Sequence, residues 1–300
     1  MQTLHRVITD DEIQKFRSKM TITHAEYLKI RDCPQRTPEW LGYRRNRVTG
    51  SNFGSAAGHN PYSTPIQLVT ESLWREFVGN AACDWGTKYE STARDEYVAW
   101  LRSQAAMAGE IDPNGIWCDE TGLMVVKSWP FAGISPDGIV HMGDGTLRLL
   151  EIKCPFKKRL YGPAIPSYYY DQVQGIMGLM LMNGLRLDGV DFVVWTPTQM
   201  NVQHFCYDAE YFDKHLFPAL QRYYDRLYTP SAILFENNEL QRGDTAFTNT
   251  IVCTEASTPP RYTGAKRPRD DGGGGGDNDF GGGSAVTVND DVLAVFRMFQ

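Results

Sequence analysis

Apolar side chains recur three to four residues apart in several segments of the chain, which is the spacing of one face of a helix. One such stripe begins behind Pro65, a residue that fits the first turn of a helix. The stripes predict a helix capped by Asp10 or Asp11 that carries Ile13, Phe16 and Met20, a helix from Pro65 with Ile66, Val69, Leu73 and Phe77 on one face, a helix with Tyr89, Ala93, Tyr97, Trp100 and Leu101 facing inward, a helix over about 167–182, and a closing helix over about 209–228.

Shorter apolar runs between these stripes are typical of β-strands. They lie between about residues 115 and 153, and again in the segments VDFVVWTP and VQHFCYD. The GDG at 143–145 is typical of a hairpin turn between two of them. Helices and strands in this order predict an α/β or α+β fold, in which a central mixed β-sheet is flanked by helices.

The density of apolar residues along the chain divides it into three parts. Residues 1–35 are expected to form an N-terminal extension, and residues 36–240 the folded domain. Residues 241–300 contain a Gly-rich, low-complexity stretch that cannot bury enough apolar surface to order itself, so a flexible tail is expected. The tail ends in NDDVLAVFRMFQ, a short helical pattern that could dock on a partner or pack back on the protein.

Composition narrows the class of protein. With 300 residues and 42% hydrophobic residues the chain can bury a sizeable core, and it contains neither a membrane-spanning apolar stretch nor a signal peptide, which predicts a soluble, intracellular protein without membrane contact. The six cysteines are scattered, which argues against a zinc site or an iron–sulfur cluster. A serine hydrolase is disfavoured because no G-x-S-x-G motif occurs.

The charge balance alone does not indicate a nucleic-acid-binding protein, because the formal net charge is −6. The basic residues are nevertheless clustered. Arg44, Arg45 and Arg47 form one group, and the segment from Lys153 to Arg159 contains a second. The tail also holds AKRPR (265–269), which resembles a nuclear-import signal but also fits a solvated basic patch.

Three charged residues stand at the ends of the predicted hairpin. Asp137 follows Pro136, and Glu151 and Lys153 are two residues apart, so that on a strand both face the same side. If the hairpin brings Asp137 beside Glu151, the two carboxylates form an oxygen-rich site suited to Mg²⁺, next to a lysine that can orient water. The alternative is a simple turn aspartate and a solvent-facing strand, and these three residues alone do not decide between them.

The same residues fit the PD-(D/E)-x-K nuclease signature, and four blocks in one order resemble the phage lambda exonuclease family of viral recombination nucleases. The blocks are RRNRVTGS (44–51), WGTKYESTAR (85–94), SPDG with EIKCPFKKR (135–159), and YYDQVQ (169–174). The resemblance spans roughly residues 38–200 and implies a restriction-endonuclease-like core.

By this resemblance, Asp137, Glu151 and the Ile152 carbonyl would bind one or two Mg²⁺ ions, or Mn²⁺, with Glu90 at a second metal position. Lys153 would position and activate water, and Gln172 would be the active-site glutamine. Two residues leave alternatives open: Thr87-x-x-Glu90 is also a capping box, and Gln172 and Gln174 face differently on a helix, so at most one reaches the site.

The resemblance also implies a pocket for the 5′-phosphate of a DNA end, formed by Arg44, Ser51, Ser135 and Arg159, which would explain the basic clusters. The expected activity is 5′-to-3′ exonucleolytic digestion of linear double-stranded DNA for recombination, repair or genome processing. An endonuclease and an inactive DNA-binding scaffold are the alternatives. A single-strand annealing protein and further copies in a trimeric ring are the implied partners, and the host cell, with the nucleus if AKRPR acts, is the implied location.

Overall fold

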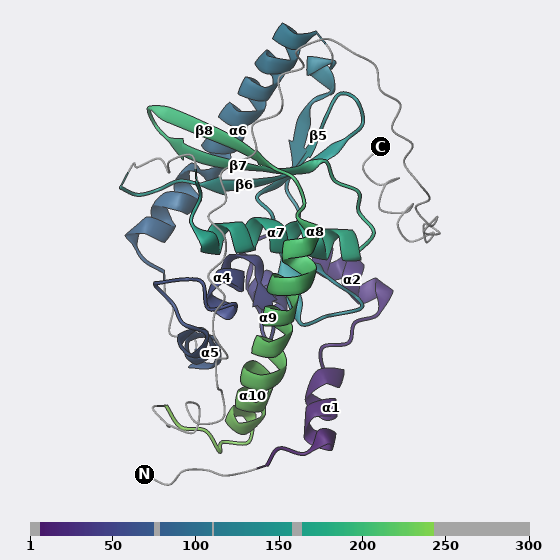
Figure 1. Ribbon diagram of the computed structural model, residues 1–300, viewed down its shortest axis with the longest axis vertical. Coiled ribbons are helices and arrows are strands. Elements are labelled where there is room, and N and C mark those ends of the chain that lie inside the picture. The colour runs from purple at the N-terminus through teal and green to yellow at the C-terminus, as the bar shows by residue number, and fades with distance from the viewer. Residues whose placement is uncertain (1–6, 75–78, 110, 158–163, 243–300) are drawn as a thin grey trace.

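The centre of the fold is a five-stranded mixed sheet (Figure 1), seen in a computed structural model that describes residues 7–74, 79–109, 111–157 and 164–242. Its strand order is β2-β5-β6-β7-β8, and only β6 and β7 run parallel. The strands are β2 (Trp117–Asp119), β5 (Gly138–His141), β6 (Leu147–Lys153), β7 (Gly189–Thr196) and β8 (Gln199–Phe205). The hairpin predicted at GDG is confirmed, because it joins the antiparallel strands β5 and β6.

Two helices cover the two faces of this sheet. Helix α6 (Ala81–Ala108) packs Ala93, Tyr97 and Leu101 against one face, and α7 (Ser167–Met182) covers the other (Figure 1). Successive strand residues alternate between the faces: Val190, Phe192 and Val194 of β7 join the core on the α7 side, while Val193 and Trp195 join the core on the α6 side. The predicted mixed sheet flanked by helices is therefore confirmed.

A smaller sheet has the order β1-β4-β3, with β1 (Val48–Thr49) parallel to β4 (Ala132–Ile134) and β3 (Met124–Val125) antiparallel to it. Helix α3 (Pro38–Tyr43) precedes β1, and the short helices η1 (Gly50–Asn52) and α4 (Phe53–Ala56) follow it. Helix α5 (Pro65–Trp74) starts at Pro65 as predicted, and η2 (Pro113–Gly115) precedes β2. The turn from β4 into β5 connects the two sheets.

The closing helix is longer and less regular than predicted. It runs from Ala209 to Glu236 as α8 (Ala209–Tyr211), η3 (Phe212–Leu216), α9 (Phe217–Arg222), η4 (Tyr223–Tyr228) and α10 (Thr229–Glu236), and η3 and η4 are π-helical. Each π segment directly precedes a turn that contains a proline, Pro218 or Pro230. A proline ring clashes with the carbonyl four residues before it, and a widened turn relieves that clash without ending the helix.

Helices α1 (Asp10–Ser18) and α2 (His24–Arg31) form the start of the described chain. The predicted cap at Asp10 or Asp11 is wrong, because Thr9 caps α1: its hydroxyl accepts from the Glu12 N–H at 3.3 Å, and Glu12 accepts from the Thr9 N–H at 3.0 Å. The two aspartates instead occupy the first turn, where they complement the helix dipole. Arg17 and Lys19 pair with Asp225 and Glu236, which ties α1 to the closing helix.

Trp100 corrects another expectation, since its side chain is 38% exposed on α6 rather than inward-facing. Among the described residues, none of the helices combines the length and hydropathy of a membrane-spanning segment. The predictions for Phe77, Arg159, the AKRPR segment and the C-terminal helical pattern lie outside the described residues. The proposed boundaries at 35 and 240 stay predictions, although Phe16 of α1 is buried in the main core.

Candidate active site

Strand β6 supplies the first two charged groups of the site. Leu149 is buried in the core on the α7 side, and Glu151 and Lys153 follow it on the same face because side chains alternate along a strand. The face therefore changes from apolar to charged toward the end of β6. Glu151 is only 3% exposed, so its carboxylate needs partners within the protein.

Gln172 of α7 and Lys153 provide those partners. Lys153 Nζ donates to Glu151 Oε1 at 2.6 Å, and Gln172 Nε2 donates to the same oxygen at 2.6 Å. The triangle is closed by Lys153 Nζ, which also donates to Gln172 Oε1 at 3.1 Å. Gln174 instead bonds to the backbone of Cys206 and Asp208, so only one of the two glutamines reaches the site.

Asp137 lies in the turn between β4 and β5 and docks on the backbone of β6. Its N–H donates to the Leu150 carbonyl at 3.0 Å, and its Oδ2 accepts from the Ile152 N–H at 2.6 Å. Burial raises the pKa of Asp137 well above its usual value, and the negative charges of Glu151 and Glu90 raise it further, while Lys153 and the Ile152 N–H act in the opposite direction. The carboxylates of Asp137 and Glu151 thus converge, as the hairpin argument required.

The donor set fits a divalent metal ion. Glu151 Oε2 is buried and has no hydrogen-bond partner in the described structure, whereas its Oε1 is occupied by Lys153 and Gln172. Within the described ranges, no three carboxylate, imidazole or thiolate groups are grouped as a complete ligand set. Asp137 and Glu151 would therefore need the Ile152 carbonyl, water and a substrate phosphate as further ligands, which is a coordination that Mg²⁺ favours.

Glu90 faces this cavity from helix α6. The capping-box alternative is wrong, because α6 begins at Ala81 with Asn80 as its cap and Glu90 lies inside the helix. Its Oε2 accepts from Arg36 Nη2 at 2.5 Å, and its Oε1 lies 3.5 Å from Arg94 Nη2. In this arrangement the carboxylate is held by two arginines, and a role as a metal ligand stays a prediction.

Three of the four predicted phosphate ligands lie in the same cavity, which has a volume of about 240 Å³. Ser135 accepts from Trp40 Nε1 at 3.3 Å, and the Arg44 guanidinium stacks 4.3 Å from the Trp40 ring. Burial lowers the pKa of Arg44 to about 10, so the side chain keeps its charge near neutral pH. Ser51 is exposed in the middle of η1. The predicted residues brought together here are Asp137, Glu151, Ile152, Lys153, Glu90, Gln172, Arg44, Ser51 and Ser135.

Sequence reasoning did not find Gln35, Arg36 and Trp40, which also line the cavity. Gln35 Nε2 donates to the carbonyls of Thr121 and Pro136, at 2.7 Å and 3.3 Å, and so holds the turn that carries Asp137. Arg36 has a left-handed backbone, with φ of 68°. None of the three belongs to a block that signalled the site, and only tertiary contacts reveal their place.

Known proteins resemble this chain over the part of the sequence that carries the candidate site. Residues 39–179 match the sequence profile of the YqaJ-like viral recombinase domain, and this range contains all four blocks found in the sequence. "Protein D345L" of African swine fever virus is 30% identical over an alignment 175 residues long, which covers 50% of this chain and 48% of that protein. "Uncharacterized protein R354" of Acanthamoeba polyphaga mimivirus is 30% identical over 161 residues, 49% of this chain and 27% of that protein. The chain thus matches about half the length of the first relative and less of the second.

Among solved structures, an alkaline exonuclease from Laribacter hongkongensis, LHK-Exo, superposes with a TM-score of 0.47 and 23% sequence identity, over 68% of this chain and 97% of that one. The same enzyme in complex with dAMP gives a TM-score of 0.45 and 18% identity, over 68% of this chain and 97% of that one.

Proposed function

We propose that the protein, whose residues 39–179 match the YqaJ-like viral recombinase domain, is a metal-dependent deoxyribonuclease that digests linear double-stranded DNA from its 5′ ends. One observation carries the proposal. The unpartnered Glu151 Oε2 lies in the same cavity as Asp137, Lys153 and the phosphate-binding candidate Arg44. A metal-ligand pair, a lysine and an arginine in one cavity are the groups that phosphodiester hydrolysis needs.

The metal position is formed by the chain's own oxygens. Asp137, Glu151 and the Ile152 carbonyl would hold Mg²⁺ or Mn²⁺, with Glu90 at a second position. A bound ion would supply Lewis-acid stabilisation of the charge that builds on the scissile phosphate. The raised pKa of Asp137 supports this assignment, because a divalent cation would relieve the repulsion that the charges of Glu151 and Glu90 impose on it.

Lys153 and Gln172 bind the carboxylate oxygen of Glu151 that would not hold the ion. Both hold Glu151 Oε1, so Oε2 stays directed away from them and available to an ion. The Lys153 ammonium would also orient the attacking water and stabilise negative charge on the phosphate oxygens. Gln172 fixes the Lys153 ammonium through its own carbonyl oxygen.

Arg44, Ser51 and Ser135 would hold the terminal 5′-phosphate, with Arg159 as a fourth predicted ligand outside the described residues. The described partners of the Arg44 guanidinium are the Thr49 hydroxyl, at 3.2 Å, and the Trp40 ring, and neither is anionic. A phosphate would therefore offset the desolvation that lowers the pKa of Arg44. An annealing protein, a trimeric ring and a nuclear location remain predictions from the resemblance.

The test is digestion of one linear duplex, labelled separately at each end, with and without a 5′-phosphate, beside a closed circle. We expect Mg²⁺-dependent loss of the 5′ label, faster with the phosphate, and an intact circle. Lys153→Ala should slow digestion of every linear substrate by about 100-fold or more, because it removes a group that acts on the reacting atoms. Arg44→Ala should slow digestion of phosphorylated ends selectively.

The proposal fails if the purified protein shows no metal-dependent cleavage, or if Lys153→Ala retains full activity. Cutting of the closed circle would show an endonuclease instead. An equal loss on phosphorylated and hydroxyl ends in Arg44→Ala would contradict the phosphate pocket while leaving the nuclease assignment in place. Arg186→Ala is a matched control, since Arg186 is exposed and lies outside the cavity lining.

A further inference from the structure

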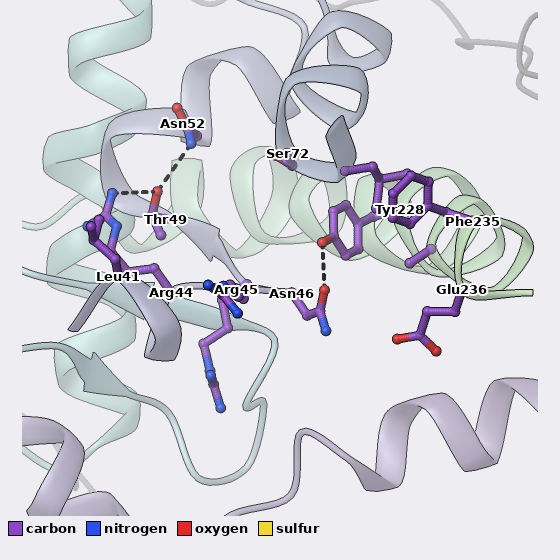
Figure 2. A pocket seen from close by; sticks show the side chains of 13 residues that line it. Leu41, Arg44, Arg45, Asn46, Thr49, Asn52, Ser72, Tyr228, Phe235 and Glu236 are labelled. Carbon is purple, nitrogen blue, oxygen red and sulfur yellow. Dashed lines mark hydrogen bonds between the residues drawn. The ribbon is translucent and has the colours of Figure 1, made fainter. Parts of the chain in front are cut away.

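A second cavity, of about 480 Å³, is larger than the candidate active site, and Figure 2 shows the residues that line it. Arg44 lines both cavities, while Asn46, Tyr228 and Phe235 line only the second. The second cavity therefore extends from Arg44 toward the closing helix and away from Asp137 and Glu151. Its volume lies within the range of about 300–1,000 Å³ that is usual for small-ligand pockets.

The wall beside Arg44 is strongly basic. Arg45 is exposed and Arg47 is half-buried, and both line the cavity. The Arg47 guanidinium is fixed by the carbonyls of Tyr43, at 2.6 Å, and Pro130, at 3.0 Å. The acidic residue in the lining, Glu236, is already paired with Lys19 at 2.6 Å. The cavity therefore has excess positive charge, which favours phosphate groups.

The closing helix forms the opposite wall and holds Asn46, which lies between Arg45 and Arg47. Asn46 adopts a left-handed backbone, with φ of 59°, and two tyrosines hold it: the Tyr224 hydroxyl donates to its carbonyl at 2.9 Å and the Tyr228 hydroxyl to its Oδ1 at 3.0 Å. Figure 2 shows Tyr228 and Asn46 facing each other, with Phe235 farther along the same helix. Because Tyr228 occupies Asn46 Oδ1, the amide Nδ2 is the end left to donate to a ligand.

The order of groups sets a direction for a bound DNA strand. In the proposed function the scissile phosphate lies at Asp137 and Glu151, and the next phosphate toward the 5′ end lies at Arg44. Any nucleotide further toward the 5′ end must then lie beyond Arg44. The second cavity begins at that residue, and its arginines are suited to continue the phosphate path.

We propose that this cavity is a subsite for a single-stranded 5′ overhang of the strand being digested. The proposal rests on the proposed function and extends its substrates from flush ends to ends that carry unpaired 5′ nucleotides. With an overhang in place, water attacks the phosphorus, the bond to the 3′ oxygen breaks, and that oxygen takes up a proton. The fragment leaves with a 3′ hydroxyl, and the remaining strand keeps the 5′-phosphate that Arg44 holds in the next cycle.

The experiment compares flush duplexes with duplexes bearing 5′ overhangs of increasing length, labelled at the overhang, and measures the first product under single-turnover conditions with Mg²⁺. The first product from overhang substrates should be an oligonucleotide rather than a mononucleotide. Arg45→Ala should lower kcat/KM on overhang ends by about tenfold or more, as expected for a lost charge-assisted contact, and leave flush ends unchanged. Arg45→Lys should restore part of the loss, and Arg186→Ala should change neither substrate.

Two results would overturn the subsite. One is release of mononucleotides alone from every overhang. The other is an Arg45→Ala variant that digests overhang ends as fast as the parent protein does. Absence of digestion of flush phosphorylated ends by the unmodified protein would instead contradict the proposed function, so the two failures are distinguishable.

Discussion

At the scale of single residues, the candidate site concentrates negative charge in a place that disfavours it. Asp137 and Glu151 converge, Glu90 adds a third charge nearby, and Lys153 offsets part of the repulsion. Such an arrangement costs folding free energy in the absence of a cation, and functional sites commonly retain costs of this kind.

Replacing the aspartate should therefore stabilise the protein when no metal is present. The pKa of Asp137 is higher in the folded state than in the unfolded state, so its contribution to stability is complete at low pH and is lost as pH rises through the folded pKa. Asp137→Asn keeps an oxygen for the Ile152 N–H and removes the charge. We expect its Tm in chelator to exceed that of the parent protein by a few degrees, at about 2–4 °C per kcal/mol for a domain of this size.

The pH dependence of Tm tests whether the buried charge of Asp137 causes this stabilisation. The difference in Tm between Asp137→Asn and the parent protein should be small at acidic pH and should grow as pH rises. Added Mg²⁺ should raise the Tm of the parent protein but not that of the variant. A difference that stays constant across pH would show that the buried charge is not the source of the effect.

At the scale of elements, the site depends on how closely α7 approaches its neighbours. A Cβ at Gly178 would lie 2.3 Å from the Phe212 ring, and one at Gly175 would lie 2.3 Å from the Phe53 ring, and both rings are buried. These two glycines let α7 pack against α4 and the closing helix. The same helix carries Gln172 to Glu151, so the close packing positions the glutamine.

Gly178→Ala should consequently destabilise the protein by about 1–3 kcal/mol, which is the usual cost of overpacking a core. Gly86 provides a matched control, since it lies inside α6 and a Cβ there would meet nothing within 4 Å. Gly86→Ala should stabilise the protein by about 0.5–1 kcal/mol, because alanine is the better helix former. Midpoints of urea unfolding at unchanged m-value measure both effects, and a neutral Gly178→Ala would contradict the packing argument.

The helices also show where the apolar pattern of the sequence was sufficient to predict an element and its ends. The range 167–182 was predicted from its apolar run and corresponds to α7, since a proline before it and a polar turn after it set clear limits. The predicted closing helix, over about 209–228, ends too early, because the helix continues past Pro230 to Glu236 and π-helical turns accommodate both Pro218 and Pro230. Trp100 has helical spacing but lies at the edge of the α6 stripe, where solvent reaches it.

At the scale of the whole molecule, a chain with a net charge of −6 gathers several basic residues at and beside the candidate active site. Arg44 and Lys153 share the candidate active site, and Arg45 and Arg47 lie beside it. DNA binding should therefore depend on few phosphate contacts rather than on a broad basic surface.

The number of phosphate contacts can be measured from the salt dependence of DNA binding. For about three phosphate contacts, the plot of log K against log salt concentration should have a slope of about −3, because each contact contributes about −0.9. Fluorescence anisotropy of an end-labelled duplex with the Asp137→Asn variant avoids digestion. Arg44→Ala should reduce the slope by about one, whereas a slope steeper than about −6 would indicate an extended basic surface.

The sequence by itself determined the alternation that places Glu151 and Lys153 on one face of a strand, the hairpin that brings Asp137 to them, and the four blocks that match the recombinase domain. Local periodicity and motif spacing carry this information, because both depend on residues close together in the chain. Only the tertiary structure decided that Gln172 contacts both Glu151 and Lys153, that Glu90 is held by arginines, and that a second basic cavity adjoins Arg44. These features depend on α6 and α7 meeting strands, and on the closing helix meeting the segment around Asn46, far away in sequence, and no local pattern encodes such contacts.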